Sequence, residues 1–384
     1  MTFDFDEPLD RRASGSEKWD EAVLERIFGR KDVLPLWVAD MDFRSPPAAA
    51  RTLQEHAHAG EFGYRLESND LLPAIADWYR TRHDMPVDPA HLIQTPGVMS
   101  GIAASIQLLS KGGDGVIIQP PVFFEFDKYV RVNHRRVVEN PLRLHEGRYT
   151  FDLDDLETKA ADPATALLIL CNPHNPVGRA WTKEELTGLS AVCRKHGVRI
   201  ISDEIYGDVV FAPHRFVPMA QVDDSVVTCF SPAKTFNVGG IVGGLLHTPE
   251  DRLAAQCRAL LDSLALTKTN DVANAVTHAV YREGAPWLDE VMNYLAENVN
   301  YARQRIDALP GVKLIEPDAT FLLWLDLHEA ASDVPDLLVN RAQLALGHGA
   351  LYGTGGIGFA RMCIACPRSI LAEAFDRLER ALSS

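Results

Sequence analysis

The stretch "SVVTCFSPAKTFNVGGIVGGLL" (residues 225–246) carries a single formal charge, on Lys234. Its first six residues are apolar or small, a pattern typical of a buried β-strand, and the lysine follows within a few residues. An ammonium group is costly to bury among apolar residues unless its charge is used or removed. The stretch therefore predicts a strand whose carboxyl end presents a functional lysine.

Other short apolar runs alternate with amphipathic segments on the N-terminal side of this strand. The clearest helical segment spans residues 182–197, where Thr182 and Glu185 form a capping box and Gly197 ends the pattern. Alternating strands and helices predict an α/β layer with a mainly parallel sheet. The four further runs that we predict as buried strands are "DGVIIQ" (114–119), "RRVVEN" (135–140), "TALLILC" (165–171) and "GVRIISD" (197–203).

A long helical pattern separates this region from the C-terminal part. Apolar residues recur at near-heptad spacing over residues 285–309 and predict a helix that joins two parts of the chain, with a coiled-coil dimer helix as the alternative. After it, two strands (312–316 and 320–327), a helix, a strand (359–365) and a last helix (368–382) predict a smaller α+β unit. The predicted domains are an N-terminal segment (1–45) that joins the small domain and the substrate entrance, a large domain (46–285) and a small domain (286–384).

Composition limits the range of functions. The chain has 384 residues and a net charge of −15, which argues against nucleic acid or an anionic membrane as a partner. No apolar run is long enough to span a bilayer, and we expect a cytoplasmic protein. The six cysteines are scattered, as in a reduced compartment, and "CIAC" (363–366) lacks a second ligand pair, so no metal site is expected.

Polar side chains follow three of the predicted strands. Asn172, Asp203 and Lys234 lie at or just beyond successive strand ends, and ligands of doubly wound sheets bind beyond the carboxyl ends of the strands. Taken singly, Asn172 and Asp203 are also typical turn residues or caps. Together they suit pyridoxal phosphate, because a lysine forms an imine with its aldehyde and a carboxylate keeps its ring nitrogen protonated. Tyr206 and Asn172 are candidates to contact the ring hydroxyl.

A phosphate seat is predicted at residues 91–109, which read as a strand, a Pro-Gly turn and a helix start. The free N–H groups of Gly97, Val98 and Met99, together with the helix dipole, form an anion site. Hydroxyl groups that can add to it belong to Ser100, Ser231 and Thr235.

Together these motifs resemble the fold-type I pyridoxal-phosphate enzymes of the aminotransferase class I/II superfamily. Nearly the whole chain is similar to one branch, the bacterial C–S β-lyases of the cystalysin and cystathionine β-lyase type. The resemblance implies a large domain with a mainly parallel seven-stranded sheet between helices, a smaller α+β C-terminal domain and pyridoxal 5'-phosphate as cofactor. It rests on "KWD" (18–20), "LPLWVADMDF" (34–43), "FGYR" (62–65), "TPGV" (95–98), "NPHNPVGR" (172–179), "SDEIY" (202–206), "AKTFN" (233–237) and "RMCIACPRS" (361–369).

By position, the resemblance implies roles for individual residues. Lys234 binds the cofactor and moves the Cα proton, and Arg361 binds the substrate α-carboxylate. Tyr64 reaches the phosphate of a neighbouring subunit, which implies a homodimer. The implied catalytic residues are Lys234, Tyr64 and Phe123. Lys234, Tyr64 and Phe123 also contact the cofactor, with Val98, Met99, Asn172, Asp203, Tyr206 and Ser231. The implied substrate contacts are Arg361, Ala39 and Asn172.

Several positions depart from the family pattern. Phe123 stands where a tyrosine is often found, so ring stacking is kept and a hydroxyl is lost. Glu125, Ala233 and Cys363 replace a common proline, serine and asparagine. Because Lys234 remains, these changes indicate a specialised substrate rather than an inactive enzyme.

The implied activity is β-elimination from an S-substituted L-cysteine, either cystathionine-like or a bulkier conjugate, to thiol, pyruvate and ammonia. Alternatives with the same motifs are transamination and decarboxylation or oxidative deamination of a cysteine conjugate. A cofactor-bound regulatory interaction protein is the non-enzyme alternative. "GTGGIG" (353–358) is expected to be a loop, and a structural role is expected for His174. Pocket and core roles stay open for Trp37, Phe62, Tyr64 and Trp324.

Overall fold

The five apolar runs between residues 114 and 230 form adjacent strands of one sheet. The computed structural model describes residues 3–63, 70–267 and 270–383. In the main sheet, β10 runs antiparallel to β2 and β9, and the other described pairs of neighbouring strands are parallel. The predicted mainly parallel sheet of seven strands is therefore confirmed. In spatial order the strands are β2 (Leu92–Thr95), β10 (Gly244–His247), β9 (Val227–Phe230), β8 (Arg199–Asp203), β7 (Thr165–Cys171), β3 (Gly115–Ile118) and β4 (Arg136–Glu139).

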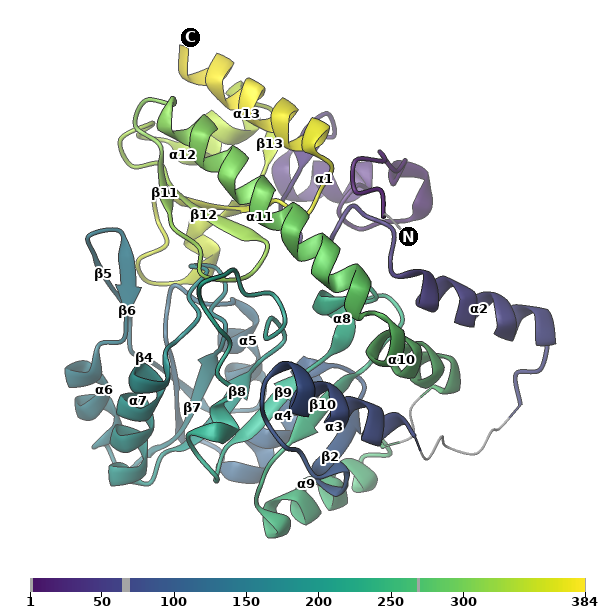
Figure 1. The fold of residues 1–384 in the computed structure, drawn as a ribbon. Coiled ribbons are helices and arrows are strands. Elements are labelled where there is room, and N and C mark those ends of the chain that lie inside the picture. The colour runs from purple at the N-terminus through teal and green to yellow at the C-terminus, as the bar shows by residue number, and fades with distance from the viewer. Residues whose placement is uncertain (1–2, 64–69, 268–269, 384) are drawn as a thin grey trace.

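Helices cover both faces of this sheet, which explains why its central strands are apolar throughout. Along β7, Leu167 and Ile169 pack on one face, while Leu168 and Leu170 pack on the other. The first face is covered by α4, α5 and α9, and the second by α6 and α7 (Figure 1). Side chains of successive strand residues point to opposite faces, so both faces of β7 are buried.

The helices of this part begin and end close to the sequence signals. The predicted capping box of Thr182 and Glu185 is present at the start of α7, and Gly197 ends that helix in the left-handed conformation. The helices are α1 (Glu21–Phe28), α2 (Pro47–Ala59), α3 (Leu71–Arg82), α4 (Val98–Leu109), α5 (Glu125–Val132), α6 (Leu153–Ala160), α7 (Lys183–His196), α8 (Pro232–Thr235), α9 (Asp251–Ser263) and α10 (Asp271–Glu283). Short 3₁₀ helices span Arg12–Ser14, Pro89–His91 and Met219–Gln221, and β5 (Arg143–His145) and β6 (Arg148–Thr150) form a hairpin.

The predicted long helix is α11 (Ala285–Asp307). It contacts α10 near its start and lies against β11 and α13 farther along (Figure 1). The C-terminal sheet is antiparallel, and its strands are β11 (Lys313–Ile315), β12 (Leu322–Asp326), β15 (Phe359–Cys363) and β14 (Gly347–His348). The remaining elements are α12 (Val334–Asp336), a π-helical turn (Leu337–Arg341), β13 (Leu344–Ala345), a 3₁₀ helix (Gly349–Tyr352) and α13 (Arg368–Ser383).

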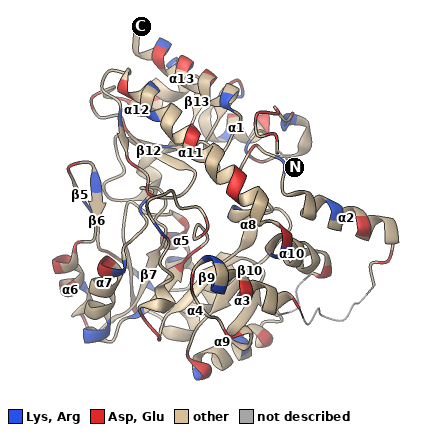
Figure 2. Ribbon diagram, viewed as in Figure 1, with Lys and Arg blue, Asp and Glu red and all other residues tan. Residues whose placement is uncertain are grey.

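The N-terminal segment is tied to the C-terminal part by backbone pairing. Strand β1 (Leu34–Pro35) lies parallel to β13, a short strand that sequence reasoning did not predict. The domain boundaries at residues 45 and 285 stay a prediction. Within the described ranges, no helix combines the length and apolarity needed to cross a membrane. Both Lys or Arg residues and Asp or Glu residues are scattered over the surface helices (Figure 2).

Candidate active site

A cavity of about 880 Å³ opens beyond the carboxyl ends of β7, β8 and β9. It is the place where ligands of parallel α/β sheets bind. The structure brings nine of the residues predicted from the sequence to its wall: Ala39, Val98, Met99, Phe123, Asp203, Tyr206, Ser231, Lys234 and Arg361. Tyr64, which the sequence predicted at a subunit contact, lies outside the described residues.

Lys234 stands in α8, directly after the central strand β9. Its Nζ donates a hydrogen bond of 2.5 Å to the carbonyl oxygen of Ala39. Burial lowers the pKa of Lys234, and the nearby Arg361 guanidinium lowers it further, although Asp40 acts in the opposite direction. A lowered pKa favours the neutral amine, which is the form that attacks an aldehyde.

Asp203 ends β8 and is buried. Its Oδ1 accepts a hydrogen bond of 3.1 Å from the backbone N–H of Ile205. Burial raises the pKa of Asp203 to about 7. The Ile205 N–H and Lys234 lower this pKa, but their combined effect is smaller than that of burial. Few of the described groups around Asp203 stabilise its negative charge. A protonated ring nitrogen of the predicted cofactor would supply the positive charge that this buried carboxylate lacks.

The start of α4 lines the cavity at the place where the sequence predicts a phosphate seat. Gly97 precedes the helix and has no side chain to cap it, so no side chain satisfies the first N–H groups of the helix, those of Val98 and Met99. A side chain at Gly244 would put Cβ 2.6 Å from the backbone nitrogen of Val98, so this glycine allows β10 to approach the helix start. Ser231 is close by and caps α8: its Oγ accepts from the Ala233 N–H at 3.1 Å and donates to the Gly243 carbonyl at 2.7 Å.

Arg361 lies within β15 and is buried. Its Nη1 donates to the side-chain oxygen of Asn175 at 3.0 Å, and its Nη2 donates to the Trp37 carbonyl at 2.7 Å. Its Nε has no hydrogen-bond partner among the described residues, and no carboxylate there pairs with it. The guanidinium carbon lies 5.2 Å from the centre of the Tyr352 ring. A buried guanidinium without an acid fits a ligand carboxylate.

One predicted site residue is placed elsewhere. The side chain of Asn172 does not line the cavity: its Nδ2 donates to the Val217 carbonyl at 2.9 Å. The second asparagine of "NPHNP", Asn175, lines the cavity instead and holds Arg361. Its backbone N–H donates to the Cys171 sulfur at 3.4 Å, so the turn folds back over the end of β7. In the sequence, the position at the end of a strand favoured Asn172 as the residue of the site. The fold of this turn instead brings Asn175 to the cavity.

The other residues singled out in the sequence lie in the cavity wall, in the core or at the surface. Tyr206 lines the cavity, and burial raises the pKa of its hydroxyl well above the usual value. His174 is buried, with Nε2 3.0 Å from the Pro121 carbonyl oxygen, and burial lowers its pKa to about 4, in agreement with a structural role. Trp37 lines the cavity, Trp324 stacks on Phe359 in the core, and Phe62 is exposed.

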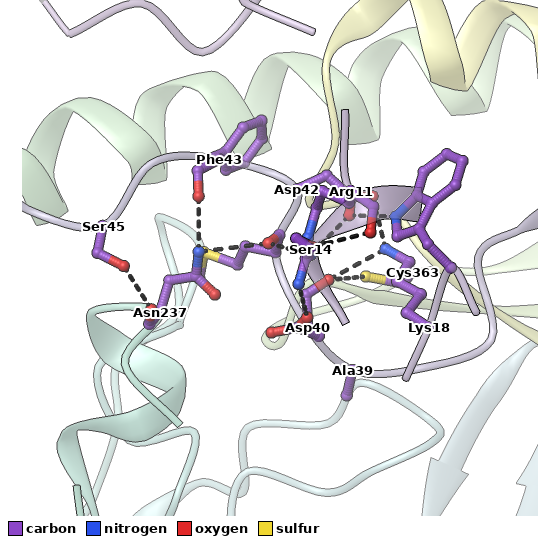
Figure 3. Close-up of polar contacts among 12 residues, drawn as sticks. Arg11, Ser14, Lys18, Ala39, Asp40, Asp42, Phe43, Ser45, Asn237 and Cys363 are labelled. Carbon is purple, nitrogen blue, oxygen red and sulfur yellow. Dashed lines mark hydrogen bonds and ion pairs between the residues drawn. The ribbon is translucent and has the colours of Figure 1, made fainter. Parts of the chain in front are cut away.

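The residue 37–43 loop is held by a buried ionic cluster that the sequence analysis missed (Figure 3). Lys18 Nζ donates to the Asp42 carboxylate at 2.7 Å and to the Asp40 carbonyl at 3.1 Å. Although burial opposes it, the Asp42 charge raises the pKa of Lys18, which is therefore charged. Asp42 also accepts hydrogen bonds from Arg11 and from the Trp19 indole, both at 2.8 Å. The charged residues of "KWD" and "WVADMDF" were the available signal.

In the described residues, neither the glycine-rich motif nor the cysteine pair forms a cofactor or metal site of its own. Residues 353–358 form turns that lead into β15, as predicted. Cys363 and Cys366 are both buried. In the part of the chain that the structure describes, no group of three or more His, Cys, Asp or Glu side chains could hold a metal ion.

Known proteins resemble this chain over its whole length. Cystathionine beta-lyase PatB of Bacillus subtilis is 37% identical and aligns with 99% of this chain and 100% of its own. Protein MalY of Escherichia coli is 33% identical, with 99% of each chain aligned. Cystalysin of Treponema denticola, solved with pyridoxal 5'-phosphate, has a TM-score of 0.94 at 28% identity, covering 100% of this chain and 99% of its own.

A PLP-bound putative aminotransferase from Clostridium difficile has a TM-score of 0.95 at 35% identity, covering 99% of this chain and 100% of its own. The sequence-based resemblance is thereby confirmed. The family model for aminotransferase class I and II matches residues 31–378. The chain therefore belongs to the aminotransferase class I and II family.

Proposed function

We propose that this protein is a pyridoxal-phosphate-dependent carbon–sulfur lyase that cleaves the Cβ–S bond of an S-substituted L-cysteine. The observation that carries the proposal is the meeting of Lys234, Asp203 and Arg361 in one cavity. An amine, a buried acid and an unpaired guanidinium are the groups needed to hold the cofactor and the α-carboxylate of an amino acid. Relatives that align with 92% or more of this chain are named cystathionine beta-lyase, which supports this branch of the family.

The residues present fit the cofactor. The N–H groups of Val98 and Met99, with Ser231 beside them, would hold its phosphate, and Asp203 would pair with its ring nitrogen. Tyr206 and Asn175 would contact the ring oxygen. Pyridoxal phosphate supplies an aldehyde that binds amines and an electron-withdrawing ring that stabilises negative charge at Cα.

The chain's own groups then account for the reaction. Arg361 holds the α-carboxylate and so orients the Cα–H bond. Lys234 takes the Cα proton as a general base, and the Cβ–S electron pair leaves with sulfur as a thiolate. Water completes the balance, so that one S-substituted cysteine and one water give one thiol, one pyruvate and one ammonia. Phe123 lines the cavity without a hydroxyl, so the leaving thiolate receives no proton from this position.

That missing hydroxyl supports a second candidate. Decarboxylation of a cysteine conjugate, or its oxidative deamination with dioxygen as the electron acceptor, keeps the Cβ–S bond and needs no proton on sulfur, and it would use the same Lys234, Asp203 and Arg361. Transamination uses the same residues but returns the proton to the cofactor. We also propose a homodimer, as the sequence prediction for Tyr64 implies.

Product analysis separates these reactions. Purified protein saturated with pyridoxal phosphate is incubated with S-methyl-L-cysteine, S-benzyl-L-cysteine and L-cystathionine. Equal amounts of pyruvate and thiol are the expected result. Carbon dioxide or an aldehyde without pyruvate would favour the second candidate. A keto acid that keeps its sulfur and forms only with an amino acceptor would contradict the lyase proposal. Sedimentation of the holoenzyme tests the homodimer.

A further inference from the structure

Three large apolar side chains remain exposed at the mouth of the active-site cavity. Ile27, Phe124 and Leu351 are 45%, 44% and 59% exposed, and all three line the cavity. They come from α1, from the turn before α5 and from the 3₁₀ helix at residues 349–352, segments far apart in the sequence. Apolar side chains that converge from separate segments around one opening are typical of a site that binds an apolar group.

Aromatic rings connect this mouth to Arg361 on two sides. On one side, the Tyr352 ring lies 5.2 Å from the Arg361 guanidinium carbon and 6.3 Å from the Phe124 ring. On the other side, the Trp37 carbonyl accepts the hydrogen bond from Arg361, and the Trp37 ring lies 5.7 Å from the Phe28 ring. An amino acid whose carboxylate is bound at Arg361 therefore lies beside aromatic rings of the cavity wall.

The charges of the described wall disfavour a zwitterionic group at this end. Its full cations are Lys234 and Arg361, and the proposed function uses both. Burial lowers the pKa of His348, which is therefore neutral near pH 7. The acids are Asp203 and Glu17. The distal carboxylate of cystathionine would lose water here and gain no described cationic partner.

From these contacts we infer that the group on the substrate sulfur is bulky and apolar, and that it binds at this mouth of the cavity. The inference rests on the proposed lyase function and specifies its substrate class: an S-aryl, S-arylalkyl or branched S-alkyl cysteine rather than cystathionine. We call the binding region the outer chamber. Its residues are Ile27, Phe28, Trp37, Phe124, Leu351 and Tyr352.

The first test compares substrates on the holoenzyme. The kcat/KM for S-benzyl-L-cysteine is expected to exceed that for L-cystathionine by about ten-fold or more, since each methylene in an apolar pocket is worth roughly ten-fold or more. Leu351→Asp should lower kcat/KM for the benzyl substrate about ten-fold. Ile357→Asp is the matched control, because Ile357 is 77% exposed, six positions away and outside the cavity wall. Leu351→Arg should shift the preference toward cystathionine. Equal kcat/KM values for both substrates would overturn the inference.

The second test does not depend on turnover. Calorimetry measures binding of 3-(benzylthio)propionate and of 3-(methylthio)propionate, which share a carboxylate for Arg361 and lack an amine, so that they cannot react with the cofactor. Tighter binding of 3-(benzylthio)propionate, weakened by Leu351→Asp and unchanged by Ile357→Asp, supports the inference. If no S-substituted cysteine releases thiol but this binding pattern is found, the lyase proposal fails and the apolar site stands. A dimer that dissociates with Leu351→Asp but not with Ile357→Asp would assign the residue to a subunit contact and overturn the inference.

Discussion

The amine of Lys234 lies 2.5 Å from the backbone carbonyl oxygen of Ala39, so the residue that is proposed to bind the cofactor rests on a loop from the N-terminal segment. The same loop supplies the Trp37 carbonyl that orients Arg361. One short segment therefore positions both the amine and the guanidinium. Figure 3 shows that Asp40 and Asp42, which follow Ala39, are anchored by Lys18 and Arg11.

Replacing Lys234 with alanine should remove the activity. A positioned acid/base alone contributes roughly 10²–10⁴-fold, and the covalent attachment of the cofactor is lost as well. Thiol and pyruvate release measure the first effect, and borohydride trapping of the cofactor on the chain measures the second. Lys111→Ala, at an exposed lysine, is the control. Borohydride labelling that persists in Lys234→Ala would place the attachment elsewhere.

Asn175 and Asn172 offer a matched pair of substitutions. Asn175→Ala removes the side-chain oxygen that accepts from Arg361, so it should raise KM for the amino acid by roughly ten-fold, the value of about one charge-assisted hydrogen bond. Asn172→Ala leaves the Val217 carbonyl without its donor and should cost stability, roughly 1–3 kcal/mol, with a smaller effect on KM. Steady-state kinetics and urea unfolding separate the two. If Asn172→Ala raised KM and Asn175→Ala mainly lowered stability, the result would support the sequence prediction that Asn172 contacts the ligands.

The Lys18 cluster should be sensitive to loss of one partner. Lys18→Met leaves the buried Asp42 carboxylate without its closest cation and should lower the free energy of unfolding by about 3–5 kcal/mol. Adding Asp42→Asn removes the carboxylate that Lys18 pairs with, so the double variant should lose less than the sum of the two single losses. Urea unfolding of the four proteins measures this coupling. Strictly additive losses would show that the two groups do not interact.

If the variant folds, Lys18→Met should also affect catalysis, because the cluster fixes the loop that carries the carbonyls of Trp37 and Ala39. We expect a raised KM and a shifted pH profile. Lys111→Met should leave both unchanged, since Lys111 is exposed and outside the cavity wall.

The cofactor-free protein should lose stability as the pH rises from about 4 to 7. Burial raises the pKa of Asp203 to about 7, above its ordinary value, so the folded state binds this proton more tightly than the unfolded state. The stabilisation is present below the unfolded pKa and is lost as pH rises through the folded pKa, at up to about 1.4 kcal/mol per pH unit for one proton.

Urea unfolding between pH 4 and 8 measures this slope. Asp203→Asn should reduce it, whereas Asp154→Asn, at an exposed position, should not. Glu204 is buried next to Asp203, and burial raises its pKa to about 8, so Glu204→Gln should also reduce the slope and extend the effect to a slightly higher pH. An unchanged slope in Asp203→Asn would mean that this carboxyl does not titrate in that range.

Much of the large sheet could be predicted because its signals are local. Strands buried on both faces are continuous apolar runs, and the helix that Thr182 caps carries its capping box in four consecutive residues. The same logic located Asp203 and Lys234, since Asp203 ends such a strand and Lys234 lies shortly after another. The short strands β1 and β13 were missed because two residues carry no periodicity and depend on pairing with a distant segment.

The amino-acid sequence by itself determined the mainly parallel sheet, the helix start at Val98 and the positions of Asp203 and Lys234 at the strand ends. Only the tertiary structure decided that Asn175 rather than Asn172 faces the cavity, that Lys18 anchors the residue 37–43 loop, and that Ile27, Phe124 and Leu351 meet at one opening. Periodicity and strand ends are properties of neighbouring residues. The direction of a side chain in a loop is instead set by packing and hydrogen bonds with segments that the chain brings together only when it folds.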